Sequence, residues 1–345
     1  MKIKKTQMRS RYMQVTVLVP IALTLLVPGC SHMRRASVAE LASSPEPYVQ
    51  VIRESNVVQL QIAARRFVPA RGKGPGIWLT GVSHIGESNY FARLQEHLEA
   101  QTLVLFEGIS DRSVGPADTS HGPNSAGSGD SAPERKGKLS SLQLSMADSL
   151  GLAFQLEAID YTRPNFRNSD LSVQQLRELV AETGAGASLE SLLNLMEGGS
   201  WLDAILQMVL RFLGTNPKFQ GLSKLALMET IGQIRGDPSE LRGLPPQLKQ
   251  LLEVLIARRN AKVIADLKEQ IQRVGRRSSI AVFYGTGHMP DMEQRLRREL
   301  GYRPAEQLWF TAFSVDLAAA RISEGEWEFV HSFVKREMEQ LQSGR

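Results

Sequence analysis

Two copies of a Gly-x-x-His pattern carry the clearest chemical signal in this sequence. Gly81 to His84 and Gly285 to His288 each follow an apolar run and precede a stretch with helical spacing. Glycine lets the chain turn sharply where a strand leaves a sheet, and it lets a ligand approach the backbone closely. The repeats therefore predict two strand–turn–helix units, each with a histidine at its turn.

Carboxylates follow two further apolar runs. Glu107 comes directly after the run 102–106, and Asp160 ends the run 154–160. Apolar runs without alternation are typical of strands that are buried on both faces in a parallel sheet. Because ligands of open α/β sheets lie beyond the carboxyl ends of the strands, we expect both histidines and both carboxylates to meet at one edge of the sheet.

This set of side chains suits hydrolytic chemistry. Two histidines with one or two carboxylates are a common ligand set for a divalent metal, which would activate water and polarise a carbonyl group. The same residues could also act without a metal, with one histidine as general base and Glu107 as its orienting partner. Arg259 lies on a long helix predicted over about 245–274. It could bind a substrate carboxylate or stabilise an oxyanion.

The strand and helix patterns together predict an α/β fold with a mixed, largely parallel central sheet flanked by helices. The α/β domain is expected over residues 51–323, starting with a strand hairpin. Helical spacing predicts an inserted all-helical subdomain at 187–243, and a composition rich in Gly, Ser and Pro predicts a mobile loop at 113–138. A C-terminal helix is expected over 324–345. Its apolar residues are expected to be buried: Phe329, Val330, Phe333 and Val334.

The N-terminus has the features of a lipoprotein signal peptide over residues 1–30. A basic segment precedes an apolar run at 17–27, which is short for a membrane span. The run ends near Cys30, the single cysteine of the chain, in residues that resemble a bacterial lipobox. We predict that Cys30 receives a lipid, with an uncleaved anchor as the alternative. A polar tether is expected at 31–50.

The predicted location is therefore the bacterial cell envelope, lipid-anchored on the periplasmic side, with the outer membrane favoured. The net charge of +5 comes from the five basic residues of the signal region, since 36 Lys and Arg face 36 Asp and Glu after it. A neutral mature chain has no electrostatic footprint for nucleic acid. The expected partners are the membrane and a peptide or small-molecule substrate, and the sequence makes no prediction of oligomeric state.

The chemically interesting residues, in their order along the chain, resemble the motifs of the TraB/Tiki superfamily (the GxxH, or GumN-like, proteins). The resemblance spans about residues 55–320. The matching segments are Gly81-Val82-Ser83-His84, Phe106-Glu107-Gly108 with Arg112, Asp160, Arg259-Asn260, and Gly285-Thr286-Gly287-His288-Met289-Pro290. This superfamily is similar in fold to erythromycin esterases and to ChaN-like haem-binding proteins.

The resemblance implies a peptidase that depends on a divalent metal, manganese or cobalt, with zinc as a further candidate. His84, Glu107 and His288 would then be the metal ligands and the catalytic core, and Arg259 a substrate or structural arginine. The sequence thus predicts a lipid-anchored, metal-dependent hydrolase, with a peptide as the first choice of substrate. Two alternatives stay open: a non-catalytic protein that binds haem, a peptide or a partner in the same crevice, and a metal-independent esterase.

Overall fold

The computed structural model describes residues 46–108, 147–182, 216–233 and 246–343. The signal peptide with Cys30, most of the tether, the loop at 113–138 and Arg112 lie outside the described residues. In the part of the chain that the structure describes, no helix is both long and apolar enough to cross a membrane.

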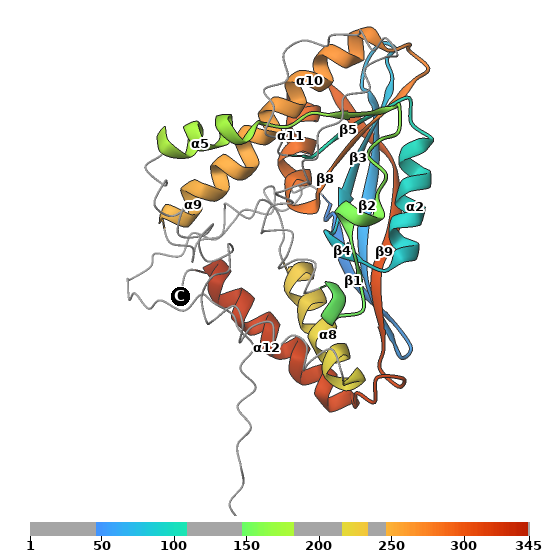
Figure 1. The fold of residues 1–345 in the computed structure, drawn as a ribbon, viewed down its shortest axis with the longest axis vertical. Coiled ribbons are helices and arrows are strands. Elements are labelled where there is room, and N and C mark those ends of the chain that lie inside the picture. The colour runs from blue at the N-terminus through green and yellow to red at the C-terminus, as the bar shows by residue number, and fades with distance from the viewer. Residues whose placement is uncertain (1–45, 109–146, 183–215, 234–245, 344–345) are drawn as a thin grey trace, which may run out of the picture. The chain divides into compact units, whose positions relative to one another are not determined.

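The described part of the fold is built on a seven-stranded mixed sheet (Figure 1). The strand order is β1-β2-β3-β8-β5-β7. Strand β9 lies off this path and pairs with β2 along the whole length of β2. Strands β3, β8, β5 and β7 are parallel to one another, whereas β1, β2, β3 and β9 meet in antiparallel pairs. The strands are β1 (Val49–Glu54), β2 (Val57–Pro69), β3 (Gly76–Val82), β5 (Leu103–Phe106), β7 (Phe166–Asn168), β8 (Ser279–Gly285) and β9 (Tyr302–Asp316). This confirms the predicted fold class and the predicted hairpin of β2 with β3.

The central strands form where the sequence has uninterrupted apolar runs. Every residue of β3 is buried, and so is every residue of β8 after Ser279. Val82 pairs with Gly285, and Phe106 pairs with Phe283. The carboxyl ends of these parallel strands therefore lie level with one another, at one edge of the sheet.

Helices cover both faces of the sheet, as Figure 1 shows. The core on one face includes residues of α2 and α8, such as Phe91 and Leu225, and the core on the other face includes residues of α10 and α11, such as Leu267 and Leu296. The helices are α2 (Ser88–Glu99), α4 (Gln155–Ala158), α5 (Val173–Glu182), α8 (Pro217–Gln233), α9 (Pro246–Glu253), α10 (Arg259–Arg273), α11 (Met289–Glu299) and α12 (Glu324–Ser343).

The long helix predicted over 245–274 is continuous but contains an irregular turn. Between α9 and α10 lies a π-helical turn, Val254–Arg258. Such turns admit an extra residue and often occur at functional sites. Directly after it, the neighbouring residues Arg259 and Asn260 are both buried.

Two features differ from the sequence analysis. Strand β1 begins at Val49, inside the range predicted as tether. Helix α8, the described part of the predicted helical insertion, packs on β1, β2 and β9 and places Leu225 and Met228 in the main core. It is therefore part of the α/β domain.

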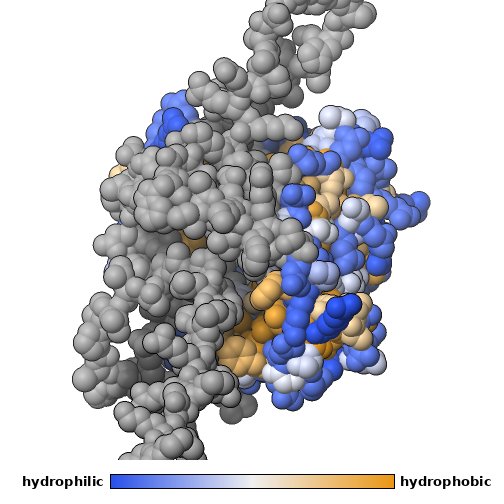
Figure 2. Space-filling model, turned by 60° about the horizontal axis from the view of Figure 1, so that its bottom comes forward, coloured by the Kyte–Doolittle hydropathy of each residue, from blue (hydrophilic) through white to orange (hydrophobic). Residues whose placement is uncertain are grey.

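Helix α12 confirms the predicted C-terminal helix but not all of its burial pattern. Val334 is buried, whereas Phe329 is 66% exposed and stacks on Phe333. The helix packs along α8, and its residues Glu324 and Trp327 contact Arg53 of β1. A helix that packs through one side buries a single stripe of residues. Figure 2 shows this end of the molecule, where hydrophobic patches interrupt a mainly hydrophilic surface.

Candidate functional site

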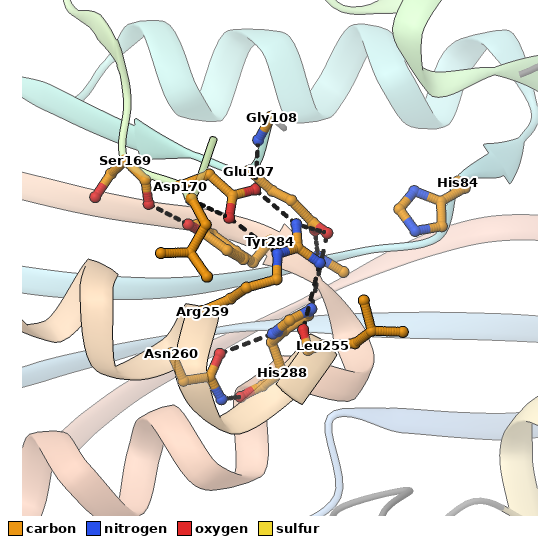
Figure 3. Close-up of polar contacts among 12 residues, drawn as sticks. His84, Glu107, Gly108, Ser169, Asp170, Leu255, Arg259, Asn260, Tyr284 and His288 are labelled. Carbon is orange, nitrogen blue, oxygen red and sulfur yellow. Dashed lines mark hydrogen bonds and ion pairs between the residues drawn. The ribbon is translucent and has the colours of Figure 1, made fainter. Parts of the chain in front are cut away.

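Polar residues follow the carboxyl ends of the four parallel strands, and together they form one cluster (Figure 3). His84 follows β3 and Glu107 follows β5, whereas His288 ends the short 3₁₀ turn after β8. The fourth residue is Asp170, two positions after β7. The predicted meeting of two histidines and two carboxylates at this edge is thus observed, but with Asp170 in place of Asp160.

The prediction of a site strand ending at Asp160 is wrong. Residues Ala153–Phe154 form β6, which pairs with β4 (Ile85–Gly86) in a separate two-stranded sheet, and α4 follows at once. Asp160 lies exposed and accepts hydrogen bonds from Thr162, 3.0 Å from its backbone nitrogen. Residues Gln155–Ala158 are helical, and a short apolar run of this kind cannot be told from a strand by periodicity alone.

Glu107 lies at the centre of the cluster. One of its oxygens accepts a hydrogen bond from Arg259 Nη2 at 2.7 Å, and the other accepts one from the Gly285 backbone N–H at 2.7 Å. His288 Nε2 lies 3.7 Å from the first oxygen. Burial would raise the pKa of Glu107, but the charge of Arg259, the two histidines and the Gly285 N–H lower that pKa to about 2. The carboxylate is therefore ionised at neutral pH.

Arg259 is a positioning residue in this geometry. Its Nε and Nη2 donate to the two oxygens of Asp170 at 2.9 and 2.6 Å, and Nη1 donates to the Leu255 carbonyl, which belongs to the π turn. With Glu107 as a further acceptor, the guanidinium directs its charge into the protein. The expectation that Arg259 binds a substrate carboxylate or an oxyanion is therefore not supported.

Asp170 is the site residue that the sequence analysis missed. Its side chain is 0% exposed, and besides Arg259 it accepts a hydrogen bond from the Gly108 backbone N–H at 3.0 Å. Strand β7 before it has three residues, too few for a visible pattern. The next residues cap α5 through a reciprocal pair of bonds between Ser172 and Gln175, so the sequence here looks like a helix start.

Each histidine has its Nδ1 atom held by a side-chain amide. Asn260 Oδ1 lies 2.7 Å from Nδ1 of His288, and Gln155 Oε1 lies 2.8 Å from Nδ1 of His84. An imidazole whose Nδ1–H is bonded to an oxygen keeps a lone pair on Nε2, as is usual in metal-binding and general-base histidines. Burial lowers the pKa of His288, although Glu107 opposes the effect, so this ring is neutral.

Gly285 gives the three side chains room to meet. A Cβ atom at Gly285 would lie 3.3 Å from Glu107 Oε2, 3.5 Å from His84 Nε2 and 3.7 Å from His288 Cδ2. At Gly81 a Cβ atom would lie 3.1 Å from Ile62 in the neighbouring strand. Gly81 lies within β3, and Gly285 has φ −48° and ψ 138°, which other residues also adopt. The glycines are thus explained by space and not by a special backbone turn.

The cluster opens to solvent on the His84 side. His84 is exposed, Glu107 is 16% exposed through its side chain, and His288 is buried. Among the described residues, no three His, Cys, Asp or Glu side chains are grouped so that they could hold a metal ion as they lie. The chemistry of the donor set nevertheless fits a cation, because His84 Nε2, His288 Nε2 and the ionised Glu107 are all electron-pair donors.

No family model matches the chain, and neither does any curated protein or solved structure with which it was compared. The assignment to the TraB/Tiki superfamily thus stays a prediction, which rests on the motif residues and their order.

Proposed function

We propose that the protein is a hydrolase of TraB/Tiki type that binds a divalent cation with His84, Glu107 and His288. The observation that supports this proposal most is the chemical type of the groups around Gly285, which are electron-pair donors. His84 Nε2 and Glu107 Oε2 both lie beside Gly285, and His288 Nε2 lies 3.7 Å from the other Glu107 oxygen. Each imidazole has its Nδ1 held by an amide oxygen. A site lined by electron-pair donors favours a cation over an anion.

The cation, with manganese or cobalt as first candidates and zinc as another, would lower the pKa of a water molecule and polarise a carbonyl group. The residues of the chain have separate tasks around it. Glu107 supplies negative charge, which Arg259 keeps ionised and fixed in place. His288, which is buried and neutral, would offer a lone pair from the interior of the protein. His84, which is exposed, would offer one from the solvent side of the site.

A peptide is the proposed substrate, because the superfamily that the motifs resemble includes peptidases. The proposed location is the periplasmic side of a bacterial cell envelope, through a lipid on Cys30 that follows the signal peptide. The partners in this proposal are the membrane and the substrate, and nucleic acid has no part in it.

Metal analysis of the purified protein tests the site assignment directly. The wild type is expected to bind one divalent ion per chain, and the His84→Ala/His288→Ala double variant is expected to lose it. His331→Ala is the matched control, since His331 lies on α12 in contact with Glu229 and should leave the metal content unchanged. Full occupancy in the double variant would sink the site assignment.

Turnover is the second measurement. Hydrolysis of a peptide library with added manganese should fall by at least about a hundredfold in Glu107→Gln, because that change removes the charge at the centre of the site. Bound metal without turnover in the wild type would instead support the non-catalytic alternative, in which the same crevice binds haem, a peptide or a partner.

A metal-independent hydrolase is the second candidate, and one observation favours it. Both oxygens of Glu107 already accept hydrogen bonds, from Arg259 and from the Gly285 N–H. In this version His288 or His84 acts as general base, with its Nδ1 held by Asn260 or Gln155, and the negative charge of Glu107 stabilises the imidazolium that forms. Activity that persists in a strong chelator, and that is lost in His288→Ala, would select this mechanism over the metal-dependent one.

A further inference from the structure

The two amides that hold the histidines differ in what they allow. Asn260 Nδ2 donates to the His288 carbonyl at 3.2 Å and to Asp291 Oδ2 at 2.8 Å. A carbonyl and a carboxylate can only accept, so the NH₂ group of Asn260 must face them. Its oxygen must then face His288 Nδ1, which carries the proton. The tautomer of His288 is fixed by this network.

Gln155 holds His84 in a network that has no such constraint. Its Nε2 lies 2.8 Å from the hydroxyl of Tyr161, and a hydroxyl can accept or donate. Burial raises the pKa of Tyr161, so the hydroxyl keeps its proton. If the amide turns over, Tyr161 donates to the Gln155 oxygen and the Gln155 nitrogen donates to His84 Nδ1. The number of hydrogen bonds is the same in both arrangements.

The backbone keeps the partners in place during such a turn. The Gln155 N–H donates to the His84 carbonyl at 2.9 Å. Ile85, the residue after His84, pairs with Phe154, the residue before Gln155, in the sheet of β4 and β6. Neither His84 nor Gln155 therefore needs to move its backbone. The exchange requires only rotation of the amide and the hydroxyl.

We propose that Gln155 and Tyr161 form a tautomer switch on His84, while Asn260 holds His288 in one state. With the Gln155 oxygen toward the ring, His84 Nε2 is an acceptor that can bind a cation. With the nitrogen toward the ring, His84 Nε2–H is a donor that faces the space beside Glu107. Nδ1 releases a proton to water and Nε2 takes one from water, so the net charge is unchanged; His84 is exposed and water reaches it. The cation-binding role of the first state rests on the proposed function, but the switch itself does not.

Nitrogen-15 NMR of the histidine rings reports the tautomers without any assay of activity. The full chain is labelled, kept in detergent and brought to rising pH until the ring shifts stop changing, so that protonation does not mask the tautomers. His84→Asn identifies the His84 signals by their loss. We expect His84 to show averaged shifts from two tautomers and His288 to show the pure Nδ1–H form, as an internal control in the same spectrum.

Gln155→Glu is the deciding variant, because a carboxylate can only accept and should hold His84 in the Nδ1–H form. The averaged His84 shifts should move to those of one tautomer, while His288 stays unchanged. Diamagnetic zinc added to the wild type should move His84 the same way. A single tautomer at His84 in the metal-free wild type, or a His84 signal that Gln155→Glu leaves unchanged, overturns the switch.

The two proposals fail separately. If zinc does not bind, the proposed cation site fails, and the metal-free spectra of wild type and Gln155→Glu still decide the switch. If zinc binds while wild-type His84 already shows one tautomer, the switch fails and the cation site stands.

Discussion

The replacement of Arg259 by leucine tests the electrostatic core of the site. Arg259 is 8% exposed through its side chain and is the counter-ion of both Glu107 and Asp170. Leucine fills much of the space but leaves two carboxylates with no positive partner. We expect the variant to lose stability and to lose function with it, because Glu107 can no longer be both buried and ionised.

Two routes give a similar size for the loss. A pKa of Glu107 lowered from its ordinary value of 4.5 to about 2 corresponds to about 3 kcal/mol of stability at neutral pH. Arg259 is the largest of the influences that lower it. The loss of one partner from a buried ion pair costs about 3–5 kcal/mol. We therefore expect Arg259→Leu to lower the free energy of unfolding by about 3–5 kcal/mol at pH 7.

The pH dependence identifies the cause of the loss. The pKa of Glu107 is depressed in the folded protein, so its contribution is fully present above about pH 4.5 and is lost as the pH falls toward about 2. Arg259→Leu lacks this contribution. The difference in unfolding free energy between wild type and variant should therefore shrink between about pH 4.5 and 2.

Urea unfolding of both proteins, followed by circular dichroism from about pH 7 to 3, measures this difference. Arg258→Leu is the matched control, since Arg258 is the preceding residue on the same helix and is exposed. Its effect should stay within about 0.5 kcal/mol. A loss below about 1 kcal/mol in Arg259→Leu, or an equal loss in Arg258→Leu, would refute the reasoning.

Two further predictions separate the site from its surroundings. Gly285→Ala places a methyl group 3.3 Å from Glu107 Oε2 and 3.5 Å from His84 Nε2, in a backbone conformation that alanine tolerates. Cation affinity measured by calorimetry should fall by at least about tenfold, with a stability change below about 1 kcal/mol, and unchanged affinity would contradict the placement. Asp170→Asn should cost about 1.5–3 kcal/mol in urea unfolding and reduce activity. Asp160→Asn should leave both quantities unchanged, and an effect on activity at this position would restore it to the site.

The sequence revealed the site residues that follow strong strand signals. His84, Glu107 and His288 come after buried runs, and their type alone marks them as candidates. Asp170 follows β7, a strand of three residues at the end of the sheet. Two of these three residues are exposed, so no apolar run precedes Asp170 in the sequence. Gln155 lies on a four-residue helix, and its contact with His84 spans 71 positions of sequence. Contacts of that kind depend on the assembled fold.

The fold class was predictable because β3 and β8 are buried on both faces and read as continuous apolar runs. The pairing of β3 with β8 was not predictable, because Gly76 pairs with Ser279, which is far away in the sequence, and no local pattern indicates that partner. The π turn at Val254–Arg258 is likewise invisible, since the residues around it are ordinary helix formers. Arg259 and Asn260, which contact Glu107 and His288, follow it directly.

The position of β8 between β3 and β5 has a consequence for how the protein is made. During synthesis β3 and β5 leave the ribosome early, and the strand that joins them, Ser279–Gly285, comes after most of the chain. Contacts at such large sequence separation slow folding, since a long loop must close before the pairing can form. A growing chain that ends before β8 lacks Gly285 and His288 and therefore cannot assemble the cluster. Under the proposed export through the signal peptide, the cluster would form only after the chain has crossed the membrane.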